Sequence, residues 1–463
     1  MFTLAVALVA LAADPKPADK TADAGPKTEK AEKAEKAAPA KDAKAAAPAD
    51  DTAAHPDSEI ADFTPEVKLL YRVVACEGDY PLPPNIDQKV LAEHCKEIKR
   101  RSGMYKKTWV DVAEPFIQAL KPAGLPKTVV YPFGGGDLIS ALTTYPEAND
   151  YTTLSLEHAG DPRRIHNVDS AKLKASLSLI RFATSGLLVA NDSKTENLQK
   201  TQRGDLPGQL SFFLIGLAVH GYEPVALHYI HVDKDGKPVP YTWGEIRERD
   251  KETATLFRKE WVNPDFSPAF DNLELVFQKK GGGEQKVHRH FAEDGADYPD
   301  KSLSKDPNAK SYGTDAPLQK YFENKGSFCA MTKAASYLLW LEKFSKIRQM
   351  LLDHMVWMIS DSTGVPHSIA VKAGFEQDFY GHFDESFLPN SAEFNKEFRA
   401  LWKKAKPLPF RYGYLDAAPK LQVHMMVTYK SGQKQPEPPA AADAGAPPAK
   451  TPTPPPAPKD AGK

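Results

Sequence analysis

Apolar residues along the chain follow two different spacings, and the two alternate. Three segments place them at helical spacing: 64–76, 86–120 and 169–189. Two short runs rich in β-branched and aromatic residues are typical of strands: "KTVVYPF" (127–133) and "DYTTLSLEHA" (150–159). A short helical pattern, "DLISALTTYP" (137–146), lies between these two runs. Helices that alternate with strands predict an α/β layer fold.

The second half of the folded region continues this alternation. Residues 206–239 predict a helix that ends at Gly221, a strand and then a turn at Asp235-Gly236. The other predicted elements are a hairpin around Gly281–Gly283 (272–292), a helical block at 333–359, strands near 367–380, a helix near 391–404, and strands at 409–414 and 420–429. We therefore expect a Rossmann-like mixed sheet with helices on both faces and an added antiparallel hairpin.

Composition limits the part of the chain that can fold. Residues 13–57 and 431–463 consist mainly of Ala, Pro, Lys and acidic residues, without apolar clusters. Such segments cannot bury enough surface to offset the entropy lost on ordering. We expect a disordered linker, a globular α/β domain at 58–430, either single or built of two fused subdomains, and a disordered tail. The net charge of −1 provides no field that would recruit nucleic acid.

The first residues favour export. The run "MFTLAVALVALAAD" ends in Ala10-Leu11-Ala12, a small-x-small pattern typical of signal-peptide cleavage, although the usual basic region is missing. A short apolar N-terminus of a cytosolic protein is the alternative. No later run approaches the roughly 20 apolar residues that span a bilayer. We expect a signal peptide at 1–12, no transmembrane segment after its removal, and a periplasmic or secreted protein associated with the cell envelope.

The three cysteines agree with export. Cys76 and Cys95 are close in sequence, and a disulfide between them would stabilise the fold by roughly 3 kcal/mol in the chain-entropy estimate. Two unrelated thiols are the alternative. Cys329 has apolar neighbours, which favours a buried small side chain over a nucleophile.

The stretch "VVYPFGGGDLISALTTYPEANDYTTLSLEHAG" (129–160) carries the main functional signal. In nucleotide-binding folds, glycines after the first strand let the backbone approach the ligand, and an acidic residue after the second strand binds the ribose. Gly134 and Glu157 fit this spacing, but three consecutive glycines are not the dinucleotide pattern. Asp137 would also place a carboxylate where a phosphate needs N–H groups. The candidate ligand-binding residues are Gly134, Gly135, Gly136, Asp137, Glu157 and His158.

The same stretch has a purely structural interpretation, which we prefer. Gly134–Gly136 would form a strand-to-helix corner, Asp137 would cap the following helix, and Glu157 would end the neighbouring strand. We therefore expect no cofactor, neither S-adenosylmethionine nor NAD. His288 and His290 share one face of a predicted strand, the geometry of two metal ligands, but an ordinary polar strand face is favoured and no metal is expected.

Four sequence blocks stand out along the folded region: "YPFGGGDL", "LSLEHAG", "KAASYLLW…FSKIRQMLLDHMVWMISDSTGVP" (333–366) and "LPFRYGY" (408–414). In these blocks the chain resembles a family of bacterial proteins, often exported, for which no activity is established. The resemblance covers most of residues 65–430. It supports the domain limits and implies no chemistry.

Two functions remain open on the sequence. We favour a cell-envelope protein that acts by binding a partner or ligand of unknown identity. The alternative is an enzyme with a methyltransferase-like Rossmann core and a site around Gly134–Asp137, at the sheet edge where open α/β folds bind ligands. The sequence contains none of the nucleophile, zinc-protease or phosphate-loop motifs that would identify catalytic residues.

Overall fold

The computed structural model describes ten stretches of the chain: 55–188, 198, 201–202, 204–252, 267–297, 311–333, 335–361, 363–382, 400–412 and 423–433. All belong to one compact unit, Ala47–Lys463. The predicted signal peptide, nearly all of the predicted linker and tail, and most of the helix predicted near 391–404 lie outside the described residues. In the described stretches, no helix combines bilayer-spanning length with a sufficiently apolar composition.

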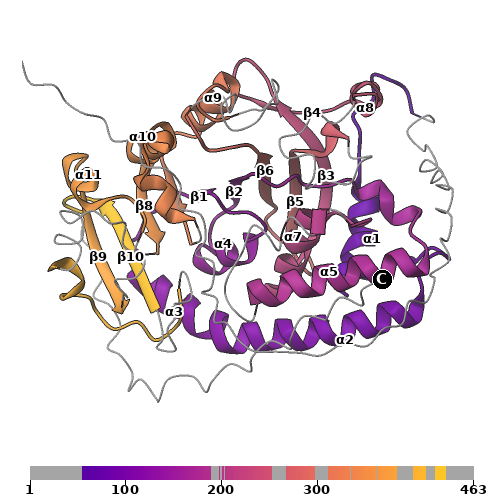
Figure 1. Ribbon diagram of the computed structural model, residues 1–463, viewed down its shortest axis with the longest axis horizontal. Helices are drawn as coiled ribbons and strands as arrows, with labels where there is room; N and C mark the ends of the chain where they lie inside the picture. Colours follow the sequence, from indigo (N-terminus) through magenta and orange to yellow (C-terminus); the bar gives the residue numbers. More distant parts are fainter. Residues whose placement is uncertain are drawn as a thin grey trace, which may run out of the picture. The chain divides into compact units, whose positions relative to one another are not determined.

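Five parallel strands form the centre of a ten-stranded sheet (Figure 1). Their order across the sheet is β6 (Lys286–Ala292), β2 (Asp150–Ser155), β1 (Thr128–Pro132), β7 (Phe328–Met331) and β8 (Met355–Ser360). The chain builds outward from β1 to one side, through β2 to β6, and then returns to place β7 on the other side of β1. This reversal makes the gap between β1 and β7 a topological switch point.

Antiparallel strands extend both ends of this parallel core. At one end, β5 (Leu273–Lys279) pairs with β6, β3 (Tyr222–Val232) pairs with β5, and β4 (Pro238–Pro240) pairs with β3. At the other end, β10 (Val423–Lys430) lies between β8 and β9 (Phe375–His382) and is antiparallel to both. The predicted Rossmann-like mixed sheet is thus confirmed, and the predicted hairpin is β5–β6.

Helices cover both faces of the sheet, and each face has its own core (Figure 1). One face buries six helices: α1 (Thr64–Val74), α2 (Gln88–Tyr105), α3 (Asp111–Leu120), α4 (Leu138–Thr144), α5 (Ser170–Leu188) and α7 (Gly208–Val219). The other buries α9 (Ala316–Asn324), α10 (Ser345–His354) and α11 (His367–Lys372). The short charged helix α8 (Trp243–Asp250) follows β4. Side chains of β1 alternate between the two cores, with Val129 and Tyr131 on the first and Val130 on the second.

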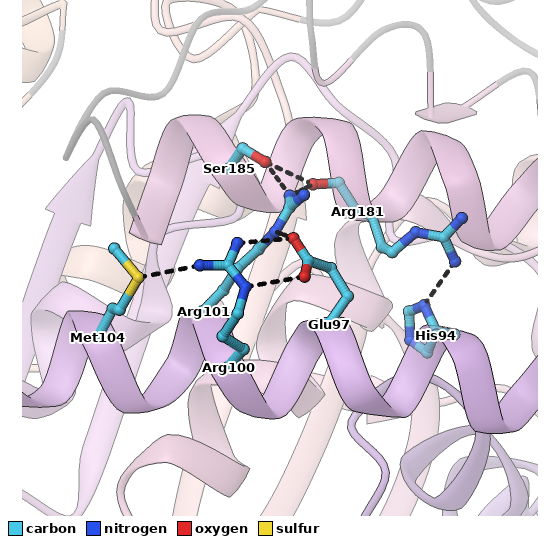
Figure 2. A network of polar contacts seen from close by, with 7 residues as sticks. All are labelled: His94, Glu97, Arg100, Arg101, Met104, Arg181 and Ser185. Carbon is cyan, nitrogen blue, oxygen red and sulfur yellow. Dashed lines mark hydrogen bonds and ion pairs between the residues drawn. The ribbon is translucent and has the colours of Figure 1, made fainter. Parts of the chain in front are cut away.

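Helices α2 and α5 are joined by a polar network and α2 is also tied to α1 by a disulfide. Glu97 accepts hydrogen bonds from Arg100 and Arg101, and these lower its pKa to about 2, the bond from Arg100 being the larger cause (Figure 2). Arg101 also donates to the carbonyl of Arg181 and to Ser185 on α5. The predicted disulfide between Cys76 and Cys95 is present, and it links the end of α1 to α2.

The helical block predicted at 333–359 is wrong in its last five residues, 355–359. Only short 3-10 turns and α10 are helical there, and residues 355–360 form the buried strand β8. The error has a physical cause: a parallel strand buried on both faces is a continuous apolar run, which periodicity does not distinguish from a buried helix. The strand predicted near 367–380 begins only at Phe375, after α11, and residues 409–412 form no strand.

Candidate functional site

Buried ionisable residues follow the carboxyl ends of all five parallel strands. Each strand is followed within a few residues by at least one of them: Glu293 after β6, Glu157 and His158 after β2, Asp137 after β1, Lys333 after β7, and Asp361 after β8. This is the edge of an open α/β sheet at which ligands bind. Asp137 and Lys333 lie on either side of the switch point.

Gly134–Gly136 form the predicted corner after β1, and all three are buried. The Gly134 N–H donates to the Leu154 carbonyl at 3.1 Å, which ties the corner to the end of β2. A methyl group on Gly136 would lie 2.7 Å from the ring of Phe212 and 2.8 Å from Oε1 of Gln209, both on α7. The absence of a side chain is therefore required for packing against α7.

Asp137 occupies the N-cap position of α4, but the predicted side-chain cap is wrong. Its carboxylate makes no cap hydrogen bond. It accepts hydrogen bonds from Tyr131 at 3.0 Å and Ser140 at 2.8 Å instead, and it forms an ion pair with Lys333 at 3.0 Å. A buried ammonium group competes successfully for a carboxylate that a helix N-terminus would otherwise attract.

Lys333 is 3% exposed and is held from three sides. Its Nζ donates to Asp137 at 3.0 Å and to Oγ of Ser140 at 2.7 Å. The same Nζ lies 5.4 Å from the centre of the Trp109 ring, within cation–π range. Trp109 belongs to a π-helical turn, Lys106–Val110, between α2 and α3, a feature frequent at functional sites.

Asp361, directly after β8, is fully buried. Its Oδ1 accepts hydrogen bonds from the N–H of Thr363 at 2.8 Å and the hydroxyl of Thr363 at 2.7 Å. The buried Ser336 also hydrogen-bonds to this carboxyl group, and the bonds from Thr363 and Ser336 lower the pKa of Asp361. Burial outweighs these effects and raises that pKa to about 6.

Backbone strain is concentrated at the same place. Among the described residues, three non-glycine residues have a positive φ: Cys76, Phe133 and Ala335. Phe133, at 60°, directly precedes the glycine corner, and Ala335, at 56°, lies between Lys333 and Ser336. Such conformations cost about 1–3 kcal/mol each and persist where the surrounding structure fixes them, often at ligand sites.

Glu157 and His158 lie just beyond β2 and are both buried. The Glu157 carbonyl is 2.7 Å from Nε2 of His290, and Nδ1 of His158 is 2.7 Å from a carboxylate oxygen of Asp271. The partners of the Asp137 carboxylate are Tyr131, Ser140 and Lys333, so the six predicted residues share a sheet edge but do not converge on Asp137.

His288 and His290 lie on the same face of β6, as predicted. Both rings contact Oγ1 of Thr153, at 2.9 Å and 3.0 Å, and both pack against Phe213. Burial lowers the pKa of His290 to about 4, so the ring is neutral at physiological pH. Within the described part of the chain, no three His, Cys, Asp or Glu side chains are grouped in a way that could hold a metal ion.

Comparison with known proteins finds no matching family model, no similar curated protein and no similar solved structure.

Sequence reasoning found half of this site. It located the glycine corner and Asp137 because the strand–glycine–helix pattern is local. It missed Lys333 and Asp361, which follow β7 and β8. Strand β7 was not predicted, and β8 was assigned to a helix. The usable signal was two short apolar runs, "FCAM" and "MVWMIS", each followed closely by a charged residue.

Packing at the corner can be tested with a pair of glycine variants. Gly136→Ala should destabilise the fold by about 1–3 kcal/mol, because the added methyl group overlaps Phe212 and Gln209. The control is Gly103→Ala in α2, where nothing lies within 4 Å and the substitution should stabilise by about 0.5–1 kcal/mol. Urea unfolding measures both. Equal effects of the two variants would contradict the proposed packing.

The burial of Asp361 predicts a pH-dependent stability. Because its folded-state pKa is about 6 and its ordinary value is 3.8, the folded state holds the proton more tightly, and stability falls as pH rises through this range. Above pH 6 the charged form should cost up to about 3 kcal/mol. Asp361→Asn keeps the acceptor for Thr363 and removes the charge, so its stability relative to wild type should increase between pH 4 and pH 7. Urea unfolding across this range should show the divergence, whereas parallel profiles would contradict it.

Proposed function

We propose that the protein binds a small polar ligand at the switch point between β1 and β7, and that it does so as a binding protein of the cell envelope. The observation that carries the proposal is the concentration of buried, incompletely satisfied polar groups at this point. Asp137 and Lys333 form a closed pair, whereas the buried hydroxyls of Thr332, directly after β7, and Ser360, at the end of β8, have no hydrogen-bond partner. Buried polar atoms without partners are uncommon and call for a specific explanation, such as a ligand or ordered water.

The position of these groups supports a ligand rather than a structural defect. At the switch point the crossover after β1 runs to one side, toward β2, and the crossover after β7 runs to the other, toward β8. Ligands of open α/β sheets bind at such a point. Left-handed residues occur on both sides of it, Phe133 on the β1 side and Ala335 on the β7 side. Strain of this kind is retained where a precise arrangement of side chains is needed.

Location in the envelope is supported by the disulfide between Cys76 and Cys95, since such bonds persist in oxidising compartments and are rare in the cytosol. The apolar N-terminal run and the Ala/Pro/Lys-rich segment after it suit a domain held at a distance from a membrane by a linker.

A methyltransferase is the second candidate, and the strand order favours it. With the inserted strands β3–β5 set aside, the remaining seven strands numbered along the chain lie in the order 3-2-1-4-5-7-6. Of these seven strands, β10, the last in the chain, alone runs opposite to the other six. S-adenosylmethionine-dependent methyltransferases with a Rossmann-like core share this arrangement, and Glu157 follows the second strand, where their acidic ribose ligand lies. A shared fold is an argument by analogy and does not establish a shared function.

The glycine corner counts against a nucleoside cofactor. In cofactor-binding folds the glycines let the backbone approach the ligand. Here Gly136 is in contact with Gln209 and Phe212 of α7, so the protein's own side chains occupy the space against that glycine. Asp137 is likewise engaged with Lys333. We therefore favour a binding protein that does not use S-adenosylmethionine over a methyltransferase.

The two candidates are separated by thermal unfolding with cofactors. We expect S-adenosylmethionine, its demethylated product and NAD to leave the melting temperature unchanged, because a ligand stabilises the fold only in proportion to its occupancy. A saturable rise that is lost in Glu157→Ala would instead establish the methyltransferase. Glu97→Ala, far from the sheet edge on α2, is the control for a general effect of removing a glutamate.

Binding at the switch point is tested by native mass spectrometry of the full chain purified from its own host. We expect a small-molecule adduct that is absent from the double variant Asp137→Asn/Lys333→Met. Both partners are changed together because removing one would leave a buried charge unpaired and destabilise by about 3–5 kcal/mol. Melting temperature monitors folding of the variant. An adduct retained by the folded double variant would move the site elsewhere, and a wild-type protein without any adduct would contradict the binding function.

A further inference from the structure

The exposed face of α2 is strongly basic, although the chain as a whole carries a net charge of only −1. Exposed residues recur at three- and four-residue intervals along α2 and the π-helical turn that follows it, so they share one face of the helix. Six of them are basic and together are called the basic face here: Lys89, Lys96, Lys99, Arg100, Lys106 and Lys107. The other exposed residues at these intervals are Ala92, Glu93 and Gly103, so the face carries one carboxylate.

The five lysines of the basic face are not neutralised by the described part of the chain, where their side chains form no ion pair or hydrogen bond. Arg100 differs, because it is bonded to Glu97, which also accepts a hydrogen bond from Arg101 (Figure 2). Glu97 is the one acidic residue in the sequence between Glu93 and Asp111. Two arginines therefore share the carboxylate nearest to the lysines, and the charge of the lysines is available to a partner outside the chain.

The basic face is open to solvent, and the neighbouring helix α5 adds no negative charge to it. A methyl group placed on Gly103, in the middle of this face, would meet no atom within 4 Å. Helix α5, to which α2 is joined by the bond from Arg101 to Ser185, has no acidic residue along Ser170–Leu188. Lys96 has like charges three and four residues further on, an arrangement that destabilises a helix. An anionic partner would offset this repulsion.

We propose that the basic face binds the surface of a membrane that contains anionic phospholipids, with its lysine side chains among the lipid headgroups. This goes beyond the proposed ligand binding and rests only on the envelope location proposed with it. The face extends from Lys89 to Lys107, about 27 Å at the usual rise of about 1.5 Å per residue, and a straight row of this length suits a flat surface. The potential of an anionic leaflet attracts such clusters of basic residues over about one Debye length, roughly 10 Å.

The chemistry of the face favours lipid headgroups over nucleic acid. Five of its six cations are lysines, whose compact ammonium groups on flexible stems suit a diffuse anionic surface, whereas arginine is the residue of bidentate phosphate recognition. The exposed residues of the face include no aromatic side chain on which a base could stack. Cys95, next to Lys96, is bonded to Cys76, and such a disulfide is typical of an oxidising compartment outside the cytosol.

The test is sedimentation of the full chain with vesicles of two compositions: phosphatidylcholine alone, and equal parts of phosphatidylcholine and phosphatidylglycerol. We expect saturable binding to the anionic vesicles only, and its loss when salt is raised to about 0.5 M, which shortens the Debye length. The quadruple variant Lys96→Gln/Lys99→Gln/Lys106→Gln/Lys107→Gln should bind about a hundredfold more weakly or worse, since each lysine near an anionic surface contributes about fivefold. Glutamine has nearly the helix propensity of lysine, so the helix is retained.

The matched control is a second quadruple variant with the same loss of charge. It changes four exposed lysines near β9 and β10, Lys372→Gln/Lys403→Gln/Lys404→Gln/Lys430→Gln, and should bind the anionic vesicles as wild type does. All variants keep the same N-terminal segment, so a difference between them reports on the basic face alone. Melting temperatures monitor folding. If the first variant does not fold, the dependence of wild-type binding on salt and on phosphatidylglycerol still decides.

Three outcomes would overturn the inference: no binding of wild type to anionic vesicles, equal binding to the neutral vesicles, or equal binding by the two quadruple variants. Binding of duplex DNA without binding of vesicles would also overturn it and assign the basic face to nucleic acid. The ligand site is tested separately. The double variant Asp137→Asn/Lys333→Met should bind vesicles as wild type does, and the variant of the basic face should keep the small-molecule adduct. A wild type without an adduct contradicts the ligand and leaves the membrane contact standing.

Discussion

The ion pair between Asp137 and Lys333 is the constraint on which this sheet edge depends. It joins the segment after β1 to the segment after β7, two strands that pair directly although 196 residues separate the two side chains in sequence. A buried ion pair adds little folding stability compared with apolar residues of the same shape, but removing one partner destabilises the fold strongly. It therefore contributes specificity more than stability: it fixes where the glycine corner, Ser140 and the π-helical turn with Trp109 lie relative to one another.

Asp361 stands in contrast to that pair. The Asp137 carboxylate has a buried ammonium group and two hydroxyls as partners, whereas Asp361 has hydrogen bonds from Thr363 and Ser336 and no ammonium group. A fold selected for stability alone would not keep the second in its charged form. The free energy lost at Asp361, together with the strained backbone at Phe133 and Ala335, is the kind of local cost that proteins carry at sites of function.

The sequence predicted the parts of this structure that depend on local pattern. The strand, glycine corner, helix and second strand at 128–155 were expected because each has its own short-range cause, and so was the disulfide. The side-chain partner of Asp137 was not predictable, because Lys333 reaches it only through the pairing of β1 with β7. Strand β8 was taken for a helix because "MVWMIS" is apolar at nearly every position, and burial on both faces removes the alternation that identifies a strand. Burial of the strands around Lys333 and Asp361 therefore also kept these two residues from being predicted as part of the site.

The place of β1 in the sheet also determines the order in which the molecule can be completed. Val129 pairs with Tyr151 on one side and with Cys329 on the other, so one edge of β1 has its partner nearby in the chain and the other must wait for a segment about 200 residues later. Closing so long a loop is slow, and until it closes, the second edge of β1 presents unpaired backbone groups. A chain that emerges from its N-terminus first, from a ribosome or across a membrane, passes through a state in which one half of the sheet exists and the central strand is still an edge. Protection of that edge, by a chaperone or by rapid delivery of β7, is thus a condition for this protein to fold without aggregating.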